Sequence, residues 1–150
     1  MNDAEERNPS ERRGGSLAEI ELEAVVENLA SATEFVTNQL ERIQCSMGTQ
    51  MQIELAVDEI FTNICMYAYA PDTGKAVISV DTDTPGIVKL TFTDSGVPYN
   101  PLEKEDPDTT LSASERKIGG LGIYLVKKSM DEMSYEYKDG HNILTLIKRV

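Results

Sequence analysis

The chain has 150 residues, of which 40% are hydrophobic, and a formal net charge of −12 at pH 7. This length suits one ordinary domain with a single core. The acidity argues against a nucleic-acid binder, because a phosphate backbone requires a basic footprint, and it favours solubility. No apolar run has the length of a membrane span or resembles a signal peptide, so we expect a cytoplasmic protein.

Residues that could form a disulfide or a zinc site are few and scattered. The two cysteines, Cys45 and Cys65, lie in apolar stretches without CxxC spacing. We therefore expect buried free thiols, as suits a reducing compartment. His141 is the only histidine and falls in an expected turn, so we assign it no role and expect no zinc site.

Periodicity and turn residues divide the chain into a tail and one domain. Residues 1–15 are polar and end in Gly-Gly, so we expect a disordered tail before a single domain over 16–150. A polar, Pro-containing segment at about 97–118 is typical of a functional lid. The remaining pattern predicts strand 17–24, helices 25–44 and 47–70, strands 75–83 and 87–94, helix 119–133, and two strands around an Asp-Gly turn within 134–150.

This order of elements predicts an α+β two-layer sandwich, with helices on one face of a mixed, mostly antiparallel sheet. The second helix should end at Pro71, and the next two strands should form a hairpin through residues 84–86. Apolar residues at helical spacing should turn one side of the second helix to the core: Ile53, Val57, Ile60, Ile64 and Ala68.

An acid and an amide interrupt this apolar helix. Glu59 and Asn63 are four residues apart, which places both side chains on one helical face. Because Glu59 neighbours the apolar stripe, we expect it to be partly buried, where a carboxylate needs a hydrogen bond or a cation. An amide oxygen suits Mg²⁺, and a nearby carboxylate could accept a proton from a hydroxyl group. The alternative is a helix-edge acid that faces water.

The third predicted strand directs an acid toward the core. Val88, Leu90 and Phe92 share one face, and Asp94 falls in the same phase. An inward acid requires a donor, which the exocyclic amino group of adenine would supply. Gly96 would permit a close approach that a Cβ would block. The alternative is an Asx-type turn, in which Asp94 accepts a hydrogen bond from its own backbone.

Glycines precede the third helix. Gly119, Gly120 and Gly122 lead directly into an amphipathic stretch, and bare N–H groups at a helix start bind phosphate well. No Gly-Lys-Ser/Thr follows, so this is not a P-loop, and no strand precedes it closely enough for a dinucleotide fingerprint. The alternative for the glycines is a flexible hinge and tight helix packing. Together with an adenine acceptor and a helix that carries an acid and an amide, the glycines favour a nucleotide site without a P-loop.

Three motifs resemble a known family. DEIFTN (58–63), DSGVPYNP (94–101) and GGLGIYLVKKSMDEM (119–133) resemble the N, G1 and G2 boxes of the Bergerat ATP-binding fold, the histidine-kinase-like ATPase domain of the GHKL superfamily. The resemblance runs from about Leu17 to the end of the chain and is closest to bacterial anti-sigma-factor serine/threonine kinases. A histidine-kinase fragment fits less well without a dimerisation helix pair, and a gyrase-like ATPase needs a transducing domain for which this chain has no room.

The resemblance implies roles for individual residues. Glu59 would be the catalytic base and Asn63 the Mg²⁺ ligand. Asp94 would contact the adenine amino group, and Gly96 would allow that approach. The other residues implied in nucleotide binding are Tyr99, Arg116, Lys117, Gly119, Gly120, Leu121 and Gly122.

Basic residues before the glycines fit the resemblance, whereas one aromatic residue departs from it. Arg116 and Lys117 lie where the family often has a basic lid residue that offsets phosphate charge; the alternative for both is a solvated loop. Tyr67 stands where many relatives have a histidine. This ring-for-ring change at the expected pocket rim leaves Glu59 and Asn63 in place.

The resemblance implies a cytoplasmic serine/threonine protein kinase that uses ATP and Mg²⁺. Its expected substrate is a STAS-domain anti-sigma antagonist, its competing partner is a sigma factor, and its expected oligomeric state is a homodimer. We expect no direct nucleic-acid partner and no membrane partner. The alternative is an ATP-gated protein-binding module with little or no phosphotransfer; the presence of Glu59 favours the enzyme.

Overall fold

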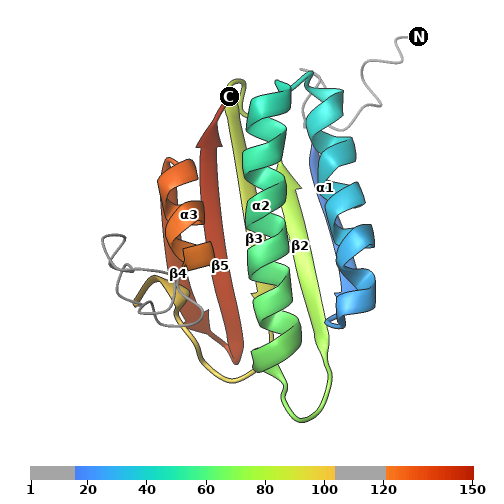
Figure 1. Ribbon diagram of the computed structural model, residues 1–150, viewed down its shortest axis with the longest axis vertical. Coiled ribbons are helices and arrows are strands. Elements are labelled where there is room, and N and C mark those ends of the chain that lie inside the picture. The colour runs from blue at the N-terminus through green and yellow to red at the C-terminus, as the bar shows by residue number, and fades with distance from the viewer. Residues whose placement is uncertain (1–15, 104–120) are drawn as a thin grey trace, which may run out of the picture.

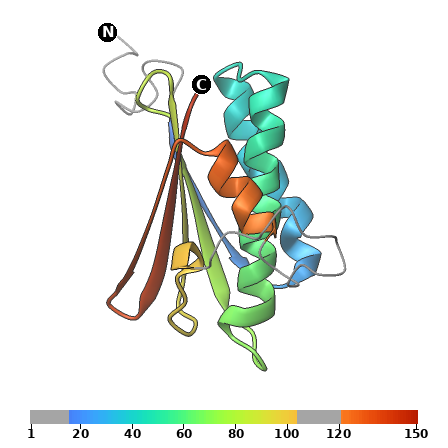
Figure 2. The same ribbon diagram turned by 60° about the vertical axis from the view of Figure 1, so that its left-hand side comes forward.

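The described part of the chain folds into two layers, with helices on one face of a sheet (Figures 1 and 2). This computed structural model describes residues 16–103 and 121–150. The tail predicted over 1–15 and most of the predicted lid lie outside those residues. The elements are β1 (Leu17–Glu23), the 3₁₀ turn η3 (Val26–Asn28), α1 (Leu29–Arg42), α2 (Met47–Asn63), the π turn η4 (Ile64–Ala68), β2 (Lys75–Asp81), β3 (Ile87–Asp94), the 3₁₀ turn η5 (Pro101–Glu103), α3 (Leu121–Ser129), β4 (Glu132–Lys138) and β5 (His141–Arg149). None of the described helices is long and apolar enough to cross a membrane.

The sheet has the strand order β1-β2-β3-β5-β4, and every pairing between described strands is antiparallel. The predicted α+β two-layer sandwich is confirmed, but the expectation of a mixed sheet is wrong for these strands. β3 and β4, which α3 connects, run in the same direction and would form a parallel pair if they were neighbours. Instead β5 lies between them, so both of its pairings are antiparallel.

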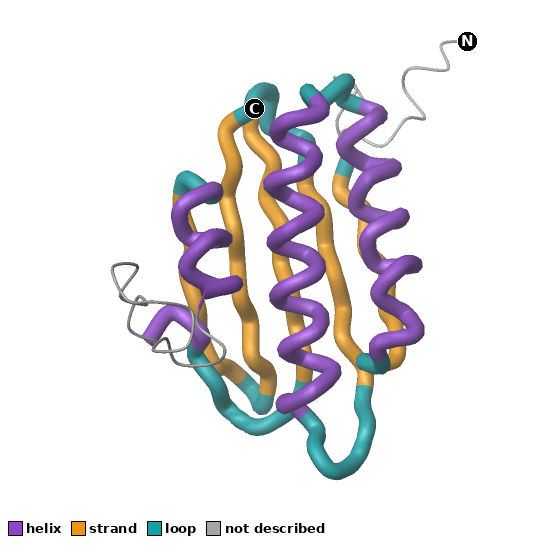
Figure 3. The backbone as a smooth tube through the Cα atoms, in the orientation of Figure 1, coloured by secondary structure: helices purple, strands orange, loops and turns teal. Residues whose placement is uncertain are grey.

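Alternation along the strands buries one face of the sheet. Val88, Leu90 and Phe92 of β3 are buried, and Asp94 follows in the same phase, as the sequence predicts. The helices cover this face, and α2 lies between α1 and α3 (Figure 3). The predicted apolar stripe of α2 and η4 belongs to the same core: Ile53, Val57, Ile60, Ile64 and Ala68.

α2 begins at a capping serine and ends in a wider turn. The Ser46 hydroxyl oxygen accepts a hydrogen bond from Thr49 N–H at 3.3 Å, which satisfies one free donor of the first turn. The periodicity predicts one helix over 47–70, whereas the α-helix ends at Asn63 and the π turn η4 follows it. Such single π turns are frequent at functional sites.

α3 ends earlier than the motif pattern predicts. The predicted helix reaches residue 133, but α3 ends at Ser129. Asp131 N–H donates a hydrogen bond to Ile147 O at 2.9 Å, and β4 pairs with β5 from Glu132 onward. Strand pairing therefore captures residues that would otherwise extend the helix, and tertiary contacts override local propensity.

The hairpin between β4 and β5 uses the predicted Asp-Gly turn. Asp139 has φ 53° and Gly140 has φ 80°, and both values lie in the left-handed region that a two-residue type I′ turn requires. The turn sets the register, so Tyr135 lies opposite Leu144. In this register Asn142 is buried on the side that the helices cover.

Both cysteines are free, as expected, but they are half-buried rather than fully buried. Burial raises the pKa of the Cys45 thiol and that of the Cys65 thiol above their ordinary value. Since the thiolate is the reactive form, both side chains are weak nucleophiles near neutral pH.

Leu90 provides a test of the inward face of β3. Leu90→Ala should lower the free energy of unfolding by about 2–5 kcal/mol, because Leu90 is 0% exposed and its truncation leaves a cavity. Leu17→Ala is the matched control: Leu17 is 60% exposed, so the change should stay within about 0.5 kcal/mol. Urea unfolding followed by circular dichroism measures both. Equal losses in the two variants would contradict the assigned face.

Candidate functional site

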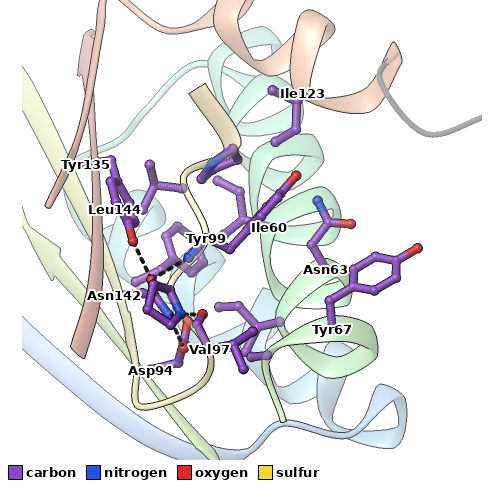
Figure 4. Close-up of a pocket in the computed structure, with 15 residues that line it drawn as sticks. Ile60, Asn63, Tyr67, Asp94, Val97, Tyr99, Ile123, Tyr135, Asn142 and Leu144 are labelled. Carbon is purple, nitrogen blue, oxygen red and sulfur yellow. Dashed lines mark hydrogen bonds between the residues drawn. The ribbon is translucent and has the colours of Figure 1, made fainter. Parts of the chain in front are cut away.

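A cavity of about 150 Å³ opens between the end of α2, the segment after β3, the β4–β5 hairpin and α3 (Figure 4). Most of its wall is apolar, and a few polar side chains reach it, as is usual for small-molecule sites. Its volume is close to that of engineered cavities that bind one small aromatic molecule, so it has room for a planar base but not for a whole nucleotide.

Asp94 is the acid of this cavity and is 7% exposed. Its Oδ1 accepts hydrogen bonds from Gly96 N–H at 2.9 Å and from Asn142 Nδ2 at 2.9 Å. No donor among the described residues reaches Oδ2. The Asx turn of the alternative is therefore present, and Asp94 also lines the cavity, while its contact with an adenine amino group stays a prediction. A ligand amino group would satisfy the second oxygen.

Asn142 is a site residue that the sequence analysis missed. Its Nδ2 donates hydrogen bonds to Asp94 Oδ1 and, at 2.9 Å, to Val97 O. Its Oδ1 accepts hydrogen bonds from Tyr99 N–H at 3.0 Å and from the Tyr135 hydroxyl (Figure 4). Burial raises the pKa of Tyr135, which keeps this hydroxyl protonated as a donor. One amide, 6% exposed, therefore joins β3, β4, β5 and the segment after β3.

The phase of β5 is the signal that could have revealed this amide. Asn142 and Leu144 are two residues apart and both lie on the buried side of the strand. An inward amide needs partners for the same reason that an inward acid does. Its partner Asp94 lies directly opposite in the β3–β5 register, which only the paired sheet reveals.

Glu59 and Asn63 meet one helical turn apart on α2, as predicted. Asn63 lines the cavity, and its Nδ2 donates a hydrogen bond to Glu59 Oε1 at 3.3 Å. Both residues are half-buried, so the prediction of a partly buried Glu59 is confirmed. Because an ionised carboxylate only accepts hydrogen bonds, the amide nitrogen faces Glu59. The Asn63 carbonyl oxygen is thereby left for another partner.

The first turn of α3 lies against the Glu59 carboxylate. A Cβ added at Gly122 would fall 2.5 Å from Glu59 Oε1 and closer still to Oε2. The resemblance implies that Gly122 lets α3 meet phosphates, whereas its close neighbour in the structure is Glu59. The absence of a side chain there leaves the space that this carboxylate occupies.

Gly96 makes a similar close approach to backbone. A Cβ at Gly96 would fall 2.6 Å from the carbonyl carbon of Ala68 and closer still to its oxygen. Val97 N–H donates a hydrogen bond to the same oxygen at 2.9 Å. The close approach predicted for Gly96 is thus present, but its partner is the last residue of η4.

The remaining predicted residues differ in where they lie. Tyr99 and Tyr67 line the cavity, and Tyr67 is 60% exposed, which agrees with the predicted rim position. Leu121 is the first described residue of α3. The others lie outside the described residues: Arg116, Lys117, Gly119 and Gly120.

Most of the chain matches one protein family. Residues 22–148 match the model of the histidine kinase-like ATPase domain. The chain belongs to this family. It is also 30% identical over 105 residues to the serine/threonine-protein kinase BtrW of Bordetella bronchiseptica, a match that covers 70% of this chain and 74% of that protein. The family resemblance drawn from the three boxes is confirmed.

Membership of an ATPase family implies ATP binding, and the residues present fit that ligand. The cavity suits a purine base, and Asp94 Oδ2 offers an acceptor for its amino group. The Asn63 carbonyl oxygen is a hard ligand of the kind that Mg²⁺ prefers. Within residues 16–103 and 121–150 no cluster of three acidic, His or Cys side chains could hold a metal. A cation at Asn63 would therefore need phosphate oxygens and water, as is usual for Mg²⁺ with nucleotides.

The hydrogen bonds of Asn142 should contribute strongly to stability. Asn142→Ala should lower the free energy of unfolding by about 2–4 kcal/mol, because it removes partners of Asp94 and Tyr135 at a buried site. Asn28→Ala is the control: Asn28 Nδ2 bonds Glu23 O at an exposed site, so its loss should be about 1 kcal/mol or less. Urea unfolding measures both, and a double-mutant cycle of Asn142→Ala with Tyr135→Phe should show coupling. Additive effects in that cycle would argue against the network.

Proposed function

We propose that this protein is a cytoplasmic serine/threonine protein kinase of the anti-sigma-factor type, which transfers phosphate from ATP to a STAS-domain anti-sigma antagonist. The observation that carries the proposal is the contact of Glu59 with Asn63 on one side and with Gly122 on the other. It brings a proton acceptor beside a metal ligand and beside the start of a helix, where phosphate binds well. The similarity to a serine/threonine-protein kinase supports the same activity.

The residues of the cavity have separate roles in this proposal. Asp94 Oδ2 accepts a hydrogen bond from the adenine amino group and selects the base. The Asn63 carbonyl oxygen holds Mg²⁺, which supplies charge neutralisation at the phosphates when bound. The start of α3 faces the phosphates with its backbone N–H groups and the positive end of its dipole. Arg116 and Lys117 stay proposed phosphate contacts.

Glu59 acts on the attacking hydroxyl group of the partner. Its carboxylate accepts the hydroxyl proton while the serine or threonine oxygen forms a bond to the γ-phosphorus. The bond between that phosphorus and the β–γ bridging oxygen breaks, and ADP leaves. Because such transfer depends mainly on positioning and charge neutralisation, a single carboxylate suffices as the base.

The partners in the proposal come from the family resemblance. A STAS-domain antagonist presents the hydroxyl group, and a sigma factor competes for the same kinase. The kinase acts as a homodimer and needs no direct nucleic-acid or membrane contact. The net charge of −12 agrees with the absence of a nucleic-acid partner.

Glu59→Gln should reduce phosphotransfer by more than about 100-fold, because an amide cannot accept the proton. ATP affinity should change by less than about twofold, since the side chain keeps its size. Phosphotransfer is measured by intact-mass spectrometry of a STAS-domain protein encoded beside this gene, after incubation with Mg-ATP. Glu54→Gln is the matched control, because Glu54 lies on the same helix and bonds the Thr37 hydroxyl instead.

The outcomes of that experiment separate two functions. Unchanged phosphorylation in Glu59→Gln would remove Glu59 as the base. Tight ATP binding by the unmodified protein with no phosphate on the STAS-domain protein would instead favour an ATP-gated binding module.

Asp94→Asn should weaken ATP binding by about 100-fold. Two donors at Oδ1 will hold the amide oxygen in that place, so the new NH₂ group will face the cavity. It would then meet the adenine amino group donor to donor. Isothermal titration calorimetry measures the affinity, with the exposed Asp72→Asn as control. Full affinity in Asp94→Asn would mean that Asp94 is only a turn residue.

A further inference from the structure

The segment after β3 is attached to the end of α2 as well as to β5. Ser95 N–H donates a hydrogen bond to the Tyr69 hydroxyl oxygen at 2.8 Å. Two residues later, Val97 N–H donates to Ala68 O at 2.9 Å. Together with the close packing of Gly96 on Ala68, these contacts fix the backbone that carries Asp94 to the last turn before Tyr69.

Tyr69 also connects this segment to the start of β2. Its hydroxyl donates a hydrogen bond to Lys75 O at the start of β2. The same hydroxyl therefore accepts from Ser95 N–H, directly after β3, and donates to β2. Its ring lies so close to Gly74 that a Cβ there would fall 2.6 Å from Tyr69 Cδ1. Tyr69 is not among the described residues that line the cavity, so any effect it has on a bound base must act through other residues.

η4 connects the proposed Mg²⁺ ligand at the end of α2 to the segment that carries Asp94. η4 begins directly after Asn63 and ends at Ala68, which contacts the Asp94 segment. One π turn therefore separates the proposed Mg²⁺ ligand from the residues that hold the base acceptor. Binding constellations tolerate displacements of only about 0.5 Å, so supporting contacts of this kind decide how well a site works.

We propose that Tyr69 is a positioning residue for nucleotide recognition. Its hydroxyl holds Ser95 against the end of η4, and so keeps Asp94 Oδ2 at the spacing from Asn63 that one ATP molecule spans. Tyr69 does this without touching the nucleotide. The proposal rests on the assignment of Asp94 to the adenine amino group under the proposed function.

Tyr69→Phe tests the role, because it removes the hydroxyl and retains the ring that packs on Gly74. Two ligands are compared by calorimetry with Mg²⁺ present: ATP, and purine riboside triphosphate, which lacks only the amino group. The preference for ATP should fall about five- to tenfold in Tyr69→Phe. A purely structural role would weaken both ligands equally and leave the preference unchanged. Tyr124→Phe is the control, since Tyr124 lies on α3 outside the cavity lining, with its ring 5.4 Å from Lys128 Nζ.

A second variant and Asp94→Asn complete the experiment. Gly96→Ala should also lose the preference, because its Cβ would push the segment off the Ala68 backbone. An unchanged preference in Tyr69→Phe, with the preference lost in Asp94→Asn, would overturn the positioning role of Tyr69 and leave the proposed function standing, whatever Gly96→Ala does. An unchanged preference in Asp94→Asn would overturn both the positioning role of Tyr69 and the assignment of Asp94 to the adenine amino group.

Discussion

A carboxylate buried at the end of a strand is the constraint on which this site depends. Asp94 continues the inward phase of β3, and removing its charge from water is costly unless donors replace the water. Gly96 N–H and Asn142 Nδ2 both donate to Oδ1. Because the two donors converge on Oδ1, they stabilise the buried charge and leave Oδ2 without a donor among the described residues. In the proposed function, one arrangement therefore meets both the requirement for stability and the recognition of a base.

That arrangement depends on strand register. Asn142 reaches Asp94 only because β5 pairs with β3 in one register, and the type I′ turn at Asp139 and Gly140 sets the start of β5. A slip of one residue would turn the amide to the opposite face of the sheet. Asp94, Val97 O and the Tyr135 hydroxyl would then lose a common partner. The position of the Asn142 side chain at the site therefore depends on the whole β4–β5 hairpin.

Local spacing was sufficient where the partners share one element. Glu59 and Asn63 are one turn apart on α2, and Asp94 follows the alternation of β3, so their placement follows from the periods of helix and strand. The alternation of β5 indicates that Asn142 points inward, but it does not identify the partner, because Asp94 is 48 residues away and is set by pairing. The early end of α3 has the same cause, since pairing with β5 begins at residue 132. At Gly96 the sequence indicates that space is needed, but only the fold reveals that the η4 backbone fills it.

An acidic protein that binds a polyanion needs local positive charge, because its net charge of −12 repels a triphosphate. In the proposed function, two devices meet this need. The start of α3 presents the positive end of its dipole. Asn63 binds the cation through a neutral amide, so the full charge of Mg²⁺ stays available to the phosphates, whereas a carboxylate ligand would cancel part of it. The nearby Glu59 is held by the Asn63 amide nitrogen and lies against Gly122, which keeps this carboxylate in the place where the proposed function needs a proton acceptor.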